Sequence, residues 1–212
     1  LDNAIKQPTK EDIHVTGASR TDAGVHAMGN VAVFKTNSTI PGRRWAYALN
    51  KYLPDDVVIQ ASWEVDESFH PRRCNTVKTY EYKILNTEFP FPKERNYSWH
   101  IPHSLDIENM NTAAQLLVGE HDFKSFCCVR TQAESTVRHI YSLEVVREAS
   151  NYITIRVTGN GFLYNMVRII AGTLAQVGRG KTTFQDIENM LESKDRCSAG
   201  QTAPPQGLTL VN

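Results

Sequence analysis

Apolar and polar residues follow two different periods along this chain, and the two periods predict different elements. Apolar residues three and four positions apart are typical of a helix with one buried face, whereas alternation at every second position is typical of a strand. The first pattern predicts helices over residues 105–118, 165–177 and 184–191, and a shorter one that opens at residues 41–44 and continues to about residue 52. The second predicts strands over residues 13–16, 30–35, 57–65, 77–85, 140–146, 152–157 and 207–211.

Strands mixed with helices, and a hairpin among them, favour an α+β fold built on antiparallel sheet over a doubly wound parallel fold. A segment rich in proline and aromatic residues, 87–102, predicts a connecting loop between two halves, 1–86 and 103–212. Residues 1–5 have the pattern of the end of an amphipathic helix, so we expect the start of the natural protein to lie upstream of Leu1.

Composition and charge narrow the choice of partners only slightly. With 41% hydrophobic residues over 212 positions, the chain can bury a core as one large domain or two small ones. Its 23 basic residues equal its 23 acidic residues, so the bulk charge does not favour a nucleic-acid partner. A local basic groove on a neutral protein is compatible with this balance.

The metal-ligating residue types do not stand at the spacings of a metal centre. The four cysteines form no C-x-x-C pair, and His26, His121 and His139 have no partner at a zinc-binding spacing. We therefore expect reduced thiols and no metal. No apolar run approaches the roughly 18 residues that a membrane span needs, which predicts a soluble, cytoplasmic protein without a membrane partner.

The segment from Gly17 to Ala27 carries the most informative residues. Small residues surround one carboxylate, Asp22, and leave room for a large molecule to approach the backbone. Arg20 and Asp22 flank Thr21, so in an extended segment their side chains point the same way. Taken alone, the pattern favours a capped turn in which Asp22 caps the following residues and Arg20 is solvated.

A resemblance reverses that interpretation. Eight consecutive residues resemble the signature loop of the TruA family of tRNA pseudouridine synthases: Arg20-Thr21-Asp22-Ala23-Gly24-Val25-His26-Ala27. Further segments resemble that family in the same order along the chain: 48–50, 53–54, 69–72, 78–82, 119–123, 125–126, 160–168 and 203–208. The family begins with a strand and a helix ahead of the signature loop, and only the tail of that helix is present here.

The resemblance implies a pseudouridine synthase fold, with two similar halves around a central cleft, and it implies roles for single residues. Asp22 matches the catalytic aspartate, and Arg20 matches an arginine that enters the RNA stack and helps extrude the target base. Tyr80 matches the active-site tyrosine, which stacks on the uracil and takes part in the later proton transfer from C5. Leu208 matches an apolar residue near the target base. Without the resemblance, Tyr80 would be interpreted as a core or cross-strand aromatic residue.

Arg168 is unusual because its predicted helix, 165–177, is apolar on nearly every side. An arginine in such a helix is expected to be buried, and a buried guanidinium needs an acidic partner. The residues alone allow any carboxylate as that partner. The resemblance implies that the partner is Asp22, which Arg168 would keep ionised in a dry pocket.

The implied activity is the isomerisation of uridine to pseudouridine in the anticodon stem-loop of tRNA, at positions 38 to 40, without a cofactor. A base inside a duplex is out of reach, so the nucleotide must be flipped out while cationic side chains hold the RNA backbone. Four paired arginines are the best candidates for this binding: Arg43, Arg44, Arg72 and Arg73.

The resemblance further implies a homodimer in which the RNA lies across both subunits. Two alternatives stay open, a pseudouridine synthase that acts on ribosomal RNA and a non-catalytic RNA-binding relative. The combination of Asp22, Tyr80 and Arg168 argues against the second, because a binding module has no need of all three. A hydrolase with an aspartate nucleophile is a more distant alternative, and it would release free uracil.

Overall fold

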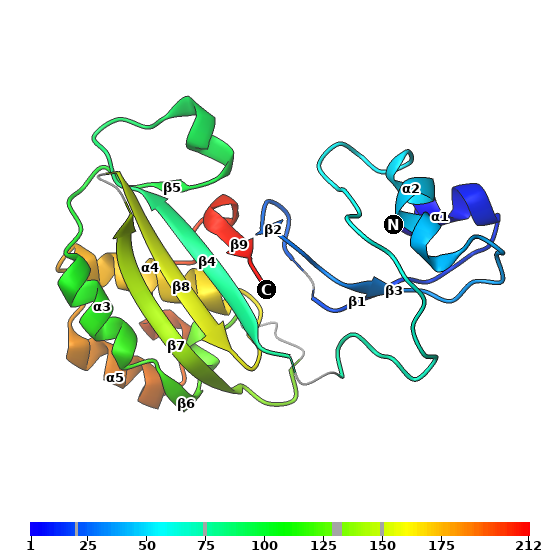
Figure 1. Ribbon diagram of the computed structural model, residues 1–212. Coiled ribbons are helices and arrows are strands. Elements are labelled where there is room, and N and C mark those ends of the chain that lie inside the picture. Colours follow the sequence, from blue (N-terminus) through cyan, green and yellow to red (C-terminus); the bar gives the residue numbers. More distant parts are fainter. Residues whose placement is uncertain (20, 74–75, 129–132, 149–150) are drawn as a thin grey trace. The chain divides into compact units, whose positions relative to one another are not determined.

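The alternating segments from residue 77 onward meet in one mixed sheet, whereas those at 13–16 and 30–35 contribute to a separate antiparallel pair (Figure 1). The computed structural model describes residues 1–19, 21–73, 76–128, 133–148 and 151–212. Its strands are β2 (His26–Ala27), β4 (Lys78–Leu85), β5 (Trp99–His100), β6 (Gly119–Asp122), β7 (Val137–Glu148), β8 (Tyr152–Gly159) and β9 (Leu208–Leu210). Within the described residues the strand order is β2-β9-β4-β8-β7-β6, and β5 pairs with β4. The pairs β2–β9 and β4–β5 are parallel and the others antiparallel, which confirms the predicted α+β class.

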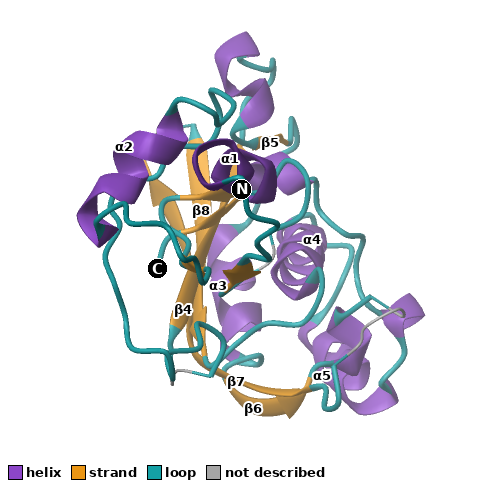
Figure 2. Cartoon of the chain, turned by 90° about the vertical axis from the view of Figure 1, so that its right-hand side faces the viewer, coloured by secondary structure: helices purple, strands orange, loops and turns teal. Residues whose placement is uncertain are grey.

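Three helices lie on one side of this sheet, as Figures 1 and 2 show: α3 (Ile107–Gln115), α4 (Met166–Gly178) and α5 (Phe184–Ser193). The helix α5 begins with a capping box, in which Thr183 and Asp186 each accept a hydrogen bond from the other's backbone N–H. Every residue of α4 is buried except Arg168 and Gln176. The prediction of a helix that is apolar on nearly every side is therefore confirmed.

The chain divides into two compact units, and Asp22 belongs to the larger one. The smaller unit contains Leu1–Arg20 and Asn30–Cys74, and the larger contains Thr21–Gly29 and Asn75–Asn212. In the smaller unit the elements are α1 (Asp2–Thr9), β1 (Thr16–Gly17), β3 (Ala32–Val33) and α2 (Trp45–Asn50). This unit has its own small core, made by Ala4, Ile5, Trp45 and Leu49.

The division does not follow the predicted halves, 1–86 and 103–212. The strand β4 pairs along its whole length with β8, so hydrogen bonding draws it into the larger unit. The predicted connecting loop, 87–102, also belongs to the larger unit, where it forms the 3-10 helix Pro92–Asn96 and the strand β5.

The predicted strand over residues 57–65 is wrong, because this segment has no regular structure. Side chains take the backbone groups that a partner strand would otherwise bind. Asn50 donates to the Ile59 carbonyl at 3.0 Å and accepts from the Ile59 N–H at 2.8 Å. In addition, Ser62 Oγ accepts from the Ala46 N–H at 2.9 Å, which attaches the segment to α2. The β-branched residues therefore run beside α2 without entering a sheet.

The segment before β9 packs directly on α4, and glycines on both sides permit the contact. A Cβ on Gly172 would lie 1.9 Å from the Gln201 carbonyl oxygen, and a Cβ on Gly200 would lie 2.7 Å from Thr173 Cα. The Gly200 N–H donates to Thr173 Oγ1 at 3.0 Å. This packing fixes the path of the chain into β9.

We predict that Gly172→Ala destabilises the protein by about 1–3 kcal/mol, the usual cost of overpacking. The expected sign is informative, because alanine inside a helix is intrinsically favoured over glycine by about 1 kcal/mol. Denaturant unfolding measures the difference, with Gly29→Ala as the control, since nothing lies within 4 Å of a Cβ at Gly29. A more stable Gly172→Ala protein would contradict the close packing.

Candidate active site

The signature loop reaches the edge of the sheet through a tight turn at Asp22. The Val25 N–H donates to the Asp22 carbonyl at 3.0 Å, and Gly24 between them has a φ of +83°, a conformation that favours glycine. Val25 packs against the core of the larger unit. The chain then enters β2, which pairs with β9, and the Met28 N–H donates to the Leu210 carbonyl at 2.8 Å.

Arg168 is paired with Asp22, as the family resemblance implies. The distance from Arg168 Nη1 to Asp22 Oδ2 is 3.3 Å, and the two side chains are 14% and 29% exposed. The same Nη1 donates to Asn165 Oδ1 at 2.9 Å, and Nε donates to the Ala203 carbonyl at 2.7 Å. The guanidinium is thus held from three sides, while the carboxylate keeps access to solvent.

Tyr80 is 9% exposed and lies near enough to Asp22 for the carboxylate to act on its phenol electrostatically. Burial raises the pKa of its phenol, and the negative charge of Asp22 raises that pKa further. The ring packs edge-on against Phe162, with 5.3 Å between the centroids. At neutral pH the phenol therefore carries its proton, and its ring is held in one orientation.

Leu208 is the first residue of β9 and is buried, with 7% exposure. It lies opposite Tyr82 in the pairing of β9 with β4. The Tyr82 hydroxyl donates to the Pro204 carbonyl at 2.7 Å, and burial raises the pKa of this phenol strongly. A Cβ on Gly24 would lie 3.2 Å from Pro205 Cγ, so the Asp22 turn packs against the same segment. Residues 203–208 therefore support Asp22 and Arg168 together.

The predicted RNA-binding arginines belong to a different part of the chain. Arg43, Arg44, Arg72 and Arg73 are exposed and lie in the smaller unit. Arg72 Nε donates to the Gly17 carbonyl at 2.8 Å, which ties it to the chain just before the signature loop. Arg20 lies outside the described residues.

Three contributors to the site were not predicted: Asn165, Ala203 and Phe162. Asn165 precedes α4 with a φ of 64°, a left-handed conformation that asparagine tolerates, and its side chain accepts from Arg168. Asn165 and Phe162 both lie within the family-like segment 160–168, which was their only signal in the sequence. The Ala203 contact uses a backbone carbonyl, which residue identity does not reveal.

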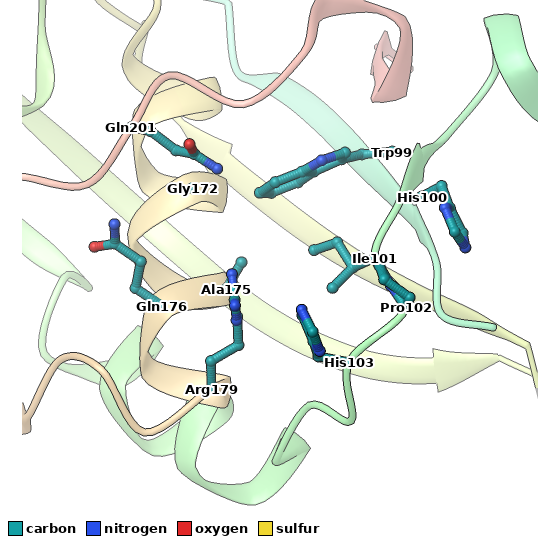
Figure 3. Close-up of a pocket in the computed structure, with 10 residues that line it drawn as sticks. All are labelled: Trp99, His100, Ile101, Pro102, His103, Gly172, Ala175, Gln176, Arg179 and Gln201. Atoms are coloured by element: carbon teal, nitrogen blue, oxygen red, sulfur yellow. The ribbon is translucent and has the colours of Figure 1, made fainter. Parts of the chain in front are cut away.

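A shallow pocket of about 180 Å³ lies beside α4, and Figure 3 shows its lining residues. Trp99, His103 and Arg179 contribute to it, whereas Asp22, Tyr80, Arg168 and Leu208 do not. Among the described residues, no three His, Cys, Asp or Glu side chains are grouped so that they could hold a metal ion. In the same part of the chain, no helix has the length and apolar character needed to cross a membrane.

Comparisons with known proteins show the family to which the chain belongs. The family model described as tRNA pseudouridine synthase matches residues 1–72 and 113–212. The tRNA pseudouridine synthase A of Thermoanaerobacter sp. (strain X514) is 49% identical over 211 residues, which cover 100% of this chain and 86% of that protein. The tRNA pseudouridine synthase A of Bacillus subtilis (strain 168) is 44% identical over 209 residues, covering 99% and 84%. The chain belongs to the tRNA pseudouridine synthase family.

We predict that Arg168→Met lowers the free energy of unfolding by about 1–3 kcal/mol, because it leaves the Ala203 carbonyl without its partner. Chemical denaturation measures this loss. Gln176→Met is the matched control, since Gln176 is the other residue of α4 that is not buried. Its side chain accepts only a long hydrogen bond from Thr182 Oγ1, at 3.4 Å, so we expect a change within about 0.5 kcal/mol. Equal losses in the two variants would show that the Arg168 contacts add nothing to stability.

Proposed function

We propose that this protein isomerises uridine to pseudouridine in tRNA, with Asp22 as the catalytic carboxylate. The observation that carries the proposal is the Asp22–Arg168 pair, 3.3 Å apart, in which the carboxylate is 29% exposed. A carboxylate in this setting is held by a fixed positive charge and is still open to a substrate. The family membership of the chain supports the same activity.

The reaction breaks the bond from C1′ to N1 of the uracil, turns the base, and forms a bond from C1′ to C5, after which C5 gives up its proton and N1 takes one up. Uridine and pseudouridine have the same atoms and the same oxidation state, so the reaction requires no cofactor. When the first bond breaks, its electron pair leaves with N1, and C1′ becomes electron-deficient. Asp22 can attack C1′, stabilise its developing positive charge, or remove a proton from the sugar. Each route requires the carboxylate to be ionised.

Tyr80 supports this chemistry as a neutral phenol. Because burial and the charge of Asp22 both raise its pKa, its oxygen is not ready to accept a proton at neutral pH. Its ring, held by Phe162, offers a flat surface on which the uracil stacks. Leu208 adds apolar surface near the base. We therefore assign Tyr80 to orienting the base as it turns.

The target nucleotide must leave its stack to reach Asp22, and the RNA backbone must be held while it does. We assign the stacking role to Arg20, and the backbone contacts to the exposed pairs Arg43-Arg44 and Arg72-Arg73. The protein has no net charge, so RNA affinity must come from such local groups and fall steeply as salt rises.

By the family resemblance we propose positions 38 to 40 of the anticodon stem-loop as targets and a cytoplasmic homodimer as the active form. Mass in solution tests the dimer, and a strict monomer that is fully active would exclude it. Action on ribosomal RNA is the alternative. Mapping pseudouridine at nucleotide resolution, after incubation with unmodified tRNA and with ribosomal RNA fragments, distinguishes the two substrates.

We predict that Asp22→Asn abolishes pseudouridine formation, because it keeps the size of the side chain and removes the charge. RNA affinity should change by no more than about two-fold, since the phosphate contacts that dominate affinity are unaffected. Single-turnover assays and filter binding measure the two quantities.

The matched control is Asp106→Asn, which makes the same substitution at the N-cap of α3, where asparagine caps as well as aspartate. It should have full activity. Appreciable product from pure Asp22→Asn protein would rule out the proposed role of Asp22.

We predict that Tyr80 contributes no pH dependence to the single-turnover rate between about pH 7 and 9.5. The pH–rate profiles of the unaltered protein and of Tyr80→Phe should therefore have the same shape in this range. The raised pKa of Tyr80 keeps the phenol protonated through this range, so no step should depend on the phenolate. Comparing pH–rate profiles of the two proteins checks this. A rate that climbs about ten-fold per pH unit, and loses that slope in Tyr80→Phe, would instead identify the phenolate as a base.

A further inference from the structure

The imidazole of His26 joins the Asp22 loop to a segment far away in the sequence. Its Nε2 lies 2.7 Å from the carbonyl oxygen of Asn96. A carbonyl oxygen can only accept, so Nε2 carries a proton and donates it. The same ring stacks on Tyr97, with centroids 5.1 Å apart and an angle of 23° between the rings. One side chain thus makes a directional bond and a ring contact with two consecutive residues.

Apart from the Asp22–Arg168 pair, the packing of Val25 and the pairing of β2 with β9, the His26 contacts attach the loop to a further segment. Thr21, Ala23 and Gly24 are exposed, and β2 is only two residues long. The Asp22 carbonyl is bonded to the N–H of Val25, the residue directly before His26. A displacement of His26 therefore reaches Asp22 through one hydrogen bond and one peptide unit.

The segment that receives His26 is itself well fixed. Glu94 accepts from Ser98 Oγ through its backbone carbonyl at 3.1 Å, and its carboxylate lies 3.7 Å from Lys83 Nζ on β4. The 3-10 helix Pro92–Asn96 also packs against the 3-10 helix Pro205–Gly207, which follows the Ala203 carbonyl that binds Arg168. The 3-10 helix Pro92–Asn96 thus contacts both the loop that carries Asp22, through His26, and the segment whose Ala203 carbonyl binds Arg168.

We infer that His26 is a positioning residue, which holds the Asp22 carboxylate in its reactive place by anchoring the signature loop on Asn96 and Tyr97. The inference rests on the proposed function for its kinetic consequence, but its structural consequence stands independently. His26 acts on the reaction through the loop and not by touching the substrate. Misplacing a reacting group by about 1 Å can cost on the order of a hundred-fold in rate.

The kinetic test uses three variants that divide the two contacts. His26→Phe keeps the ring contact, His26→Gln keeps a donor, and His26→Ala loses both. We expect kcat at saturating tRNA to fall by about ten- to a hundred-fold in His26→Ala and by less in the other two. The dissociation constant for tRNA should stay within about two-fold. A weakened affinity with unchanged kcat would overturn the inference and make His26 an RNA contact.

Two controls separate positioning from general damage. His121→Ala removes a similar side chain, which lies on β6, at the opposite end of the strand order from β2. Its ring nitrogen lies 3.0 Å from the Val118 carbonyl, and its ring contacts Phe123. Asn96→Ala leaves the bonded carbonyl in place. Both should have kcat within about two-fold of the unaltered protein. A loss in His121→Ala equal to that in His26→Ala would overturn the inference.

Hydrogen exchange of the free protein tests the anchoring without any activity. The N–H groups of Val25 and Met28 are bonded to Asp22 and Leu210, so they report on the order of the loop. We expect both to exchange at least about ten-fold faster in His26→Ala and to be unchanged in His121→Ala. Unchanged exchange in His26→Ala would overturn the inference. If the unaltered protein formed no pseudouridine, the proposed function would fail while this measurement still decided the anchoring.

Discussion

A guanidinium that is largely withdrawn from water must have its N–H groups satisfied, and the active-site end of the larger unit is organised around that requirement at Arg168. Its Nε donates to the Ala203 carbonyl, and the Ala203 N–H donates back to the Arg168 carbonyl at 3.1 Å. Asn165 supplies a second acceptor from the turn before α4. The remaining need for negative charge is met by Asp22.

The rest of the site follows from this arrangement. The reciprocal bonds draw residues 200–203 against α4, and that approach is possible only because Gly172 and Gly200 lack side chains. From there the chain passes Pro204, which accepts from the Tyr82 hydroxyl, and continues into β9. The strand β9 offers the edge on which β2 pairs, directly after the Asp22 turn. The segment that satisfies the arginine therefore also locates the aspartate.

Periodicity predicted the elements that depend on burial, and it failed where a particular polar contact decides. The helix α4 and the hairpin of β7 and β8 were predicted because their apolar positions repeat over many residues. The strand at 57–65 was predicted wrongly, since the Asn50 side chain bonds its backbone in place of a neighbouring strand. The short strands β2 and β6 were missed, because segments of 2 and 4 residues are too short to show a periodicity. The apolar helix predicted a buried Arg168, whereas the side chain is 14% exposed, and its partner came only from the family resemblance.

The Asp22–Arg168 pair joins residues 146 positions apart, and β2 pairs with a strand near residue 209. Contacts of such long range are slow to form, because the whole intervening chain must close around them. During synthesis the signature loop leaves the ribosome long before its arginine and its supporting strand exist. An unfinished chain therefore displays the signature loop without the partner that holds its carboxylate. The catalytic centre comes into being only when residues 203–210 have emerged, so its assembly depends on a segment that is synthesised long after the aspartate it supports.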